Sequence, residues 1–297
     1  MKEVIECVPN ISEGKRKEII EEIIGNLKKL NIKLLDYSSD EDHNRTVITF
    51  VGDKENIVKG AVQVAKDAAR LIDLRAHRGT HPRMGAVDVI PFIPVKNVTM
   101  KDCVDISKQT AKIIGEEVGI PVYLYAESAT KESHRLLPEI RKGEFEGFFE
   151  KIKDPEWVPD YGPKEVNPTA GVTAVGAREF LIAYNINLNT NDVNVARKIA
   201  RSIRESSGGL RYIQAKEMKL EEKGCVQVSV NILNYKKAPI YRVFELVRME
   251  AERYGVSVLE SELVGLMPMK AALESLSFYL QFPELNEDQI LEMKIYE

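Results

Sequence analysis

The spacing of apolar residues divides this chain of 297 residues into two passages that repeat one order of predicted elements. Isoleucines and leucines recur at helical spacing over residues 15–30. Each passage then reads strand, helix, strand, strand, helix, strand. The predicted elements are strand 2–8, helix 15–30, strands 32–36 and 46–51, helix 54–72 and strand 87–95, followed by strand 180–188, helix 193–204, strands 210–220 and 226–233, helix 239–254 and strand 256–259.

This order is that of the split β-α-β, or ferredoxin-like, unit (βαββαβ). Two such units predict the α+β class, with subdomains at residues 1–178 and 179–297 and a ligand cleft or channel between them. The passages share no clear sequence identity, so only the pattern repeats. Between them we expect an extra helix at 99–118, a strand at 122–125 and a short helix that ends near Lys142.

The segment 143–178 has no helical or strand periodicity. A stretch this long without regular structure is predicted to be a linker or a functional loop. Within it, residues 162–171 read Gly-Pro-Lys-Glu-Val-Asn-Pro-Thr-Ala-Gly, and glycine lets a backbone approach a flat ligand closely. An ordinary linker is the alternative.

Charge and cysteine content limit the class of protein. The net charge is −4, with 42 basic and 46 acidic residues, which disfavours nucleic acid and anionic membranes as general partners. Three lone cysteines suit a reducing compartment. We find no signal-peptide pattern and no apolar run near the length of a membrane span, so we expect a cytoplasmic protein.

Two of the four histidines, His77 and His81, lie in the segment Arg75 to Gly85. Gly79 and Pro82 make this segment a loop. Imidazoles among arginines can hold an anionic substrate and transfer a proton near neutral pH. A solvated charged loop explains the composition equally well.

Other interpretations of this loop are weaker. His77 and His81 have the spacing of a helical zinc site, but glycine and proline argue against a helix and no third ligand is evident, so no metal is expected. An RNA-binding loop would carry aromatic residues among the arginines. No GxGxxG, P-loop or GxSxG motif is present, so nucleotide cofactors and serine-hydrolase chemistry lack support.

Two further polar clusters have ordinary structural explanations. Asp40 to Arg45 lies between two predicted strands, where a charged hairpin turn is expected. Asn10 to Gly14 follows the first strand and can begin a helix with Ser12 as its N-cap. A functional role is the alternative in both cases.

Taken together, these segments resemble the glutamate formimidoyltransferase family, which includes the transferase part of formiminotransferase-cyclodeaminase. The similar motifs run in order from about residue 3 to about residue 280. They are Cys7 to Gly14, Asn44 to Val47, His81 to Asp88, Pro91 to Val95, Pro121 to Tyr125, Gly176 to Arg178 and Leu263 to Leu266.

The resemblance implies a homodimer, a folate channel between two ferredoxin-like subdomains, and transfer of the formimino group of N-formimino-glutamate to N5 of tetrahydrofolate, its co-substrate. It implies His81 as the catalytic histidine. It also implies that folate binds the following ten residues: Gly162, Pro163, Lys164, Glu165, Val166, Asn167, Pro168, Thr169, Ala170 and Gly171.

Arginines and acids near these motifs are candidate substrate ligands. Arg45, Arg83 and Arg178 could bind carboxylates of glutamate or folate, and Asp40 could steady the cationic formimino group. Ser38 stands where vertebrate-like relatives carry an acid, which Asp40 or Asp42 could replace, and Thr80 stands where some relatives carry Glu.

Two other functions remain open at this stage. The chain could transfer a formyl group from N-formyl-glutamate or use another reduced pterin as the acceptor. It could also be a non-catalytic folate-binding protein on the same fold.

Overall fold

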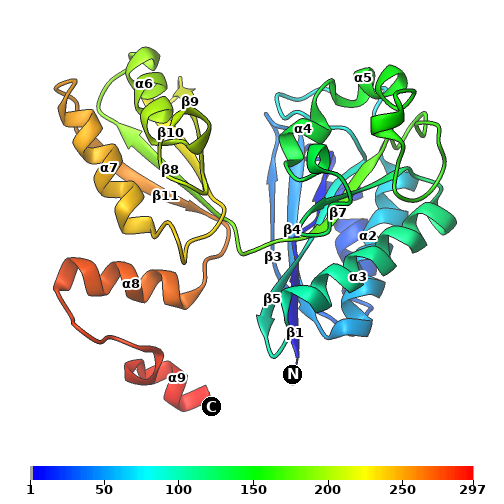
Figure 1. Ribbon diagram of the computed structural model, residues 1–297, viewed down its shortest axis with the longest axis horizontal. Helices are drawn as coiled ribbons and strands as arrows, with labels where there is room; N and C mark the ends of the chain where they lie inside the picture. The colour runs from blue at the N-terminus through cyan, green and yellow to red at the C-terminus, as the bar shows by residue number, and fades with distance from the viewer. Residues whose placement is uncertain (1–2, 297) are drawn as a thin grey trace. The chain divides into compact units, whose positions relative to one another are not determined.

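A computed structural model describes residues 3–296, so residue 2 of the predicted first strand lies outside the described part. The chain divides between Arg178 and Glu179 into two compact units, and each unit has its own hydrophobic core. No helix within residues 3–296 is long and apolar enough to cross a membrane. Helices and two separate sheets give the α+β composition expected from the sequence (Figure 1).

The first unit is built on a seven-stranded sheet. The strand order is β1-β4-β2-β5-β7-β6, β3 pairs with the outer side of β4, and β1 also pairs with β5. Pairing is antiparallel except where β7 lies parallel to both β5 and β6. The strands are β1 (Val4–Cys7), β2 (Asn10–Ile11), β3 (Lys33–Asp40), β4 (Arg45–Gly52), β5 (Val87–Lys96), β6 (Val122–Ala126) and β7 (Thr173–Ala177).

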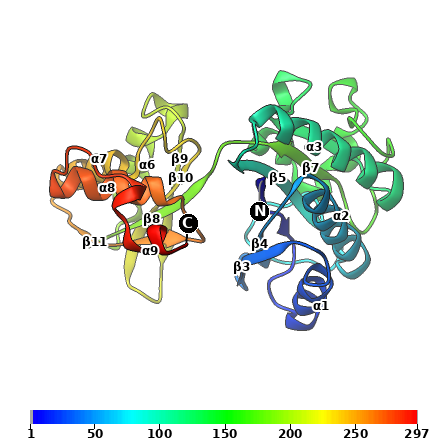
Figure 2. The same ribbon diagram turned by 90° about the horizontal axis from the view of Figure 1, so that it is seen from below.

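Three long helices cover one face of this sheet (Figure 2). They are amphipathic, and their apolar residues pack on Ile48, Phe50 and Phe92 of the sheet. Two short helices follow β6. The helices are α1 (Lys17–Leu27), α2 (Lys54–Leu71), α3 (Met100–Ile113, continued by a π-helical turn Ile114–Val118), α4 (Leu137–Arg141) and α5 (Glu144–Lys151), with 3₁₀ turns at Glu132–His134 and Pro155–Trp157.

Two sequence-based expectations about this unit are wrong. The segment 143–178 is not without structure, because it contains α5 and β7, and β7 is an inner strand of the sheet. Ser12 does not cap a helix, since α1 begins at Lys17 after Arg16. The Ser12 hydroxyl instead donates to the carbonyl of Gly85 at 2.7 Å, so it fastens the start of the chain to the loop before β5.

The second unit repeats the order strand, helix, strand, strand, helix, strand in a four-stranded antiparallel sheet, β11-β8-β10-β9. Alternate residues of β8 and β10 are buried against α6 and α7, as period-two patterning requires. The elements are β8 (Ile182–Leu188), α6 (Val193–Ile203), a 3₁₀ turn (Glu205–Ser207), β9 (Ile213–Leu220), β10 (Cys225–Ile232), α7 (Ile240–Glu252), β11 (Val258–Val264), α8 (Met269–Leu280), a 3₁₀ turn (Glu287–Gln289) and α9 (Leu291–Tyr296). The last strand runs to Val264, five residues beyond its predicted end at 259.

A close backbone approach joins the loop before β5 to the segment before β7. Gly85 and Gly171 form an antiparallel bridge. It is flanked by hydrogen bonds from Ala86 N to Ala170 O (2.9 Å) and from Val172 N to Met84 O (3.0 Å). A Cβ atom at Gly85 would lie 2.0 Å from the carbonyl oxygen of Val172, so the contact requires glycine.

The carboxyl group of Glu6 is buried within the first sheet. Glu6 of β1 is 4% exposed, and its Oε2 has no hydrogen-bond partner among the described residues. Burial raises the pKa of Glu6 to about 7, although the positive charge of Arg178 acts in the opposite direction. The protonated form is therefore favoured in the fold over much of the acidic range.

The buried carboxyl predicts a pH-dependent stability. Between about pH 4.5 and about pH 7 the folded chain holds a proton on Glu6 that the unfolded chain has lost. The free energy of unfolding therefore falls as pH rises through this window. Relative to the parent, Glu6→Gln should gain roughly 2–3 kcal/mol of stability from pH 4 to pH 8 in urea unfolding. Exposed Glu18→Gln is the control, and a difference that is constant with pH would contradict the assignment.

The backbone approach predicts a sensitive glycine. Gly85→Ala should lower the free energy of unfolding by about 2–4 kcal/mol, because backbone atoms must separate to admit the methyl group. Gly25→Ala in α1 is the matched control, since its Cβ would meet no atom of another described element within 4 Å. This control should raise stability by up to about 1 kcal/mol. Equal urea midpoints for Gly85→Ala and the parent would show that the approach is looser than described.

Candidate functional site

The four histidines differ in burial. His77 and His134 are 6% and 0% exposed, whereas His43 and His81 are only partly buried. His134 stacks on Trp157 with ring centroids 5.0 Å apart, inside the layer formed by the short helices. His43 and His81 lie together, with ring centroids 6.4 Å apart and planes inclined by 66°. These two are therefore the imidazoles open to a proton-transfer role.

His77 is fixed as a neutral imidazole. Its Nδ1 accepts a hydrogen bond from Arg83 Nε at 3.1 Å, so its proton resides on Nε2, which donates to the carbonyl of Asn44 at 2.9 Å. Burial lowers the pKa of His77, and the nearby Arg83 charge adds to this effect while the Asn44 bond opposes it. His77 is thus a structural bridge between the loop 72–86 and the turn after β3.

Arg83 is buried, and all three of its guanidinium nitrogens are engaged. Nη1 lies 2.9 Å from Glu144 Oε2 and 3.0 Å from Glu146 Oε2, and Nη2 lies 2.6 Å from Glu146 Oε1. Burial lowers the pKa of Arg83, but the bonds to Glu146 and Glu144 raise it above its ordinary value. The Arg83 carbonyl also accepts from Phe145 N at 2.8 Å. Arg83 therefore ties the His81 loop to α5.

The turn between β3 and β4 is fastened to the same loop. Asn44 adopts a left-handed conformation (φ 50°), its Oδ1 accepts from Gly14 N at 2.9 Å, and its Nδ2 donates to Arg78 O at 3.0 Å. Thr80 N donates to the carbonyl of Asp42 at 3.1 Å. The three polar segments that the sequence singled out around residues 10–14, 40–45 and 75–85 are therefore in contact.

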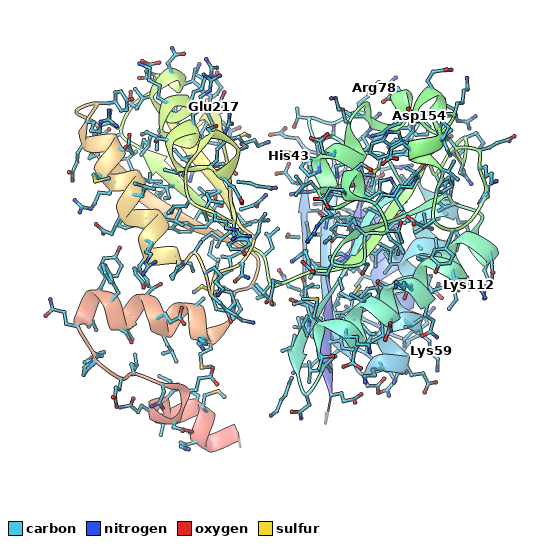
Figure 3. The ribbon with its side chains drawn as sticks, viewed as in Figure 1. His43, Lys59, Arg78, Lys112, Asp154 and Glu217 are labelled. Atoms are coloured by element: carbon cyan, nitrogen blue, oxygen red, sulfur yellow. The ribbon has the colours of Figure 1, made fainter. Side chains whose placement is uncertain are left out.

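Asp40 and Arg45 occupy the two sides of this turn. They are paired at the end of the β3–β4 ladder. Burial would raise the pKa of Asp40, but the backbone hydrogen bond from His43 and the nearby His43 ring lower it. Burial and the charge of Arg141 lower the pKa of Arg45, while Asp40 and Asp88 partly offset this. Asp40 thus lies against His43, which Figure 3 labels in this turn.

Three arginines of the first unit, Arg45, Arg141 and Arg178, have neighbours in common. Arg141 Nε donates to Asp88 Oδ2 at 2.8 Å, and Asp88 Oδ1 accepts from Met84 N at 2.8 Å. Burial raises the pKa of Tyr125, and the charges of Arg178 and Arg141 act against that rise. Arg45, Arg141 and Arg178 are therefore linked through common neighbours, and Arg141 is already paired with Asp88.

The segment 162–171 begins and ends against different elements. At its start, a Cβ on Gly162 would lie 2.6 Å from the carbonyl of Ile120, and residues 162–165 are exposed. At its end, Asn167 Oδ1 accepts from Thr169 N (3.1 Å) and Ala170 N (2.9 Å), which makes a tight turn. Thr169 O accepts from Leu74 N at 2.9 Å, so this turn adjoins the His81 loop.

This arrangement can bind anions and transfer a proton. It combines two partly exposed imidazoles with arginines and a carboxylate on an anchored framework. Within residues 3–296, no group of three His, Cys, Asp or Glu side chains could hold a metal ion. Sequence reasoning missed Arg141, Glu144 and Glu146, which have no motif of their own and bond to residues 53 to 63 positions away.

Comparisons with known proteins identify the family of the chain. Residues 4–178 match the family model described as "Formiminotransferase domain, N-terminal subdomain", and residues 183–296 match "Formiminotransferase domain". A "Glutamate formimidoyltransferase" of Streptococcus pyogenes serotype M1 is 47% identical, with 98% of each chain covered. One from Thermoplasma acidophilum is 46% identical, over 98% of this chain and 97% of its own.

A longer relative covers the same region. "Formimidoyltransferase-cyclodeaminase" of Rattus norvegicus is 45% identical over 94% of this chain, which matches 53% of the rat protein. The two family models and the near-complete coverage of the shorter relatives confirm the resemblance found in the sequence. This chain belongs to the formiminotransferase family.

Proposed function

We propose that the chain is a glutamate formimidoyltransferase, which moves the formimino group of N-formimino-L-glutamate to N5 of tetrahydrofolate and releases L-glutamate. The observation that carries this proposal is the His81 loop: a partly exposed imidazole on an anchored loop beside arginines. Relatives that are named for this activity match nearly the whole chain.

The chemistry requires one proton to leave N5 and one to reach the departing glutamate nitrogen. A group that titrates near working pH can serve both steps, and histidine suits this best. His81 takes the N5 proton as the bond to the formimino carbon forms, and it returns a proton when the old bond breaks. His77 is unsuited to this role because both of its nitrogens are already bonded.

The substrate carboxylates need cationic partners. Arg45 and Arg178 are assigned to this role, supported by the shared field that they form with Arg141. Asp40 is assigned to the cationic formimino group. Arg83 is better suited to holding the loop, because a carboxylate ligand would have to displace its bonds to Glu144 and Glu146.

Folate is assigned to residues 162–171. Two features support this: four consecutive residues of the segment are exposed, and its final turn hydrogen-bonds to the chain that leads to His81. The folate channel implied by the resemblance stays a prediction.

The finer features of the fold and assembly are proposals of the same kind. We assign each unit to the ferredoxin-like fold, supported by the order β11-β8-β10-β9 and by the matching order β5-β1-β4-β3 in the first unit. We also expect a homodimer. Large exposed apolar side chains on the second unit, among them Leu259, Phe278, Leu280 and Phe282, support an association of this kind.

The decisive assay is a matrix of donors and acceptors. The purified chain is given N-formimino-glutamate or N-formyl-glutamate, each with tetrahydrofolate or another reduced pterin. The proposal expects turnover with the formimino donor and tetrahydrofolate to exceed every other pair. Preference for the formyl donor would show that N-formyl-glutamate is the substrate instead. Tight folate binding without any turnover would favour a binding protein.

His81→Ala should lower kcat by about 10²–10⁴-fold, because no other group then moves the proton. Folate affinity and thermal unfolding should stay near those of the parent, because the side chain is partly exposed. Turnover near the parent value in a folded His81→Ala protein would remove His81 from the mechanism.

Arg83→Lys separates two roles for this arginine. Lysine keeps the charge but cannot make the bond to His77 and the fork to both glutamates together. A positioning role predicts a fall in kcat of about tenfold with KM little changed. A carboxylate-binding role predicts a raised KM with kcat preserved. Exposed Arg78→Lys, in the same loop, is the control and should behave as the parent.

A further inference from the structure

His43 has no role in the assignments above, although it is the side chain whose ring contacts His81. The two ring centroids are 6.4 Å apart with planes inclined by 66°, which is an edge-to-face arrangement. The His43 side chain is 27% exposed. An imidazole in this position touches the ring that is proposed to move the proton.

Asp40 holds His43 at two points. Its Oδ1 accepts from the backbone nitrogen of His43 at 2.8 Å, and its Oδ2 lies 2.9 Å from the ring Nδ1. A carboxylate beside one imidazole nitrogen orients the ring and favours a proton on it.

Backbone contacts set the distance between the two histidines. The carbonyl of Asp42 accepts from Thr80 N, and Asn44 Nδ2 donates to Arg78 O. A Cβ on Gly79 would lie 2.4 Å from the carbonyl of His43. The main chain of the turn that carries His43 is therefore in contact with the main chain of the loop that carries His81. These backbone contacts help to fix the distance between the two rings.

We propose that His43, oriented by Asp40, is a positioning residue for His81 that holds its ring in place and couples its protonation to the Asp40 carboxylate. This inference rests on the proposed formimino transfer. The N5 proton passes to His81 and from His81 to the departing glutamate nitrogen, and His43 takes part in neither transfer.

The charged groups around His43 come from three elements. Asp40 ends β3, Arg45 begins β4 on the other side of Asp40, and His81 approaches from the loop before β5. Glu41 and Asp42 belong to the same turn as His43 and are exposed. Asp40 thus interacts with both Arg45 and His43. Through it, Arg45, which is proposed to bind substrate, is connected to the two histidines.

The kinetic test is a double-mutant cycle. His43→Gln keeps a polar side chain of similar reach but cannot titrate, and it should lower kcat roughly tenfold with KM little changed. In the His81→Ala background the same substitution should cause no further loss, because His43 acts only through His81. Glu41→Gln, in the same turn, is the control. An equal loss in both backgrounds, or no loss in the parent, would overturn the proposal.

A second measurement does not require turnover. In NMR titrations, His43→Gln removes the imidazole that contacts both Asp40 and His81, so the negative charge of Asp40 is less compensated and the midpoint of the His81 ring signal should rise by roughly half a unit or more. An unchanged midpoint would overturn the proposal. A parent without formimino transfer would overturn the proposed function instead, and the titration would still decide whether the two rings are coupled.

Discussion

The backbone approach of Gly85 to Gly171 is the constraint on which the site depends. It places the end of the His81 loop against the start of β7, with hydrogen bonds on both sides of the bridge. The hydroxyl of Ser12 binds the same glycine carbonyl that leads into β5. Because three distant segments meet at main-chain atoms, a loop without helix or strand can still hold an imidazole in a defined place.

Buried polar side chains complete this framework. His77 links Arg83 to the carbonyl of Asn44, and Arg83 links the loop to α5. Each partner satisfies a group that would otherwise be costly to bury. Lys151 adds to the order of this region, because its ammonium group donates to three carbonyls at the end of α4 (Glu139, Ile140 and Lys142). Most of the charged residues around the candidate site therefore stabilise the structure, and fewer of them can bind substrates.

Much of the fold could be predicted because long amphipathic helices and alternating strands carry a strong periodic signal. Helices 54–72 and 193–204 agree with α2 and α6 to within one residue at each end. The strand β7 could not be predicted in this way. Its five residues, Thr-Ala-Val-Gly-Ala, are all buried and mostly small, so they show neither alternation nor a distinctive apolar run.

The candidate site was predictable only in part, for a related reason. Composition placed His77 and His81 in one basic loop but could not separate them, and the resemblance to a family singled out His81. Burial then distinguishes them, because His77 is enclosed and bonded at both nitrogens. The partners of Arg83 lie 61 and 63 residues later in the chain, and no local pattern reports a contact of that separation.

The place of β7 has a consequence for how the chain is made. It is the last strand of the first unit to be synthesised, yet it lies between β5 and β6. Until residues 173–177 leave the ribosome, β6 has no parallel neighbour, and the glycine bridge that fixes the His81 loop cannot form. His81 is therefore synthesised well before the residues that fix its loop. The candidate site can assemble only when the first unit is complete.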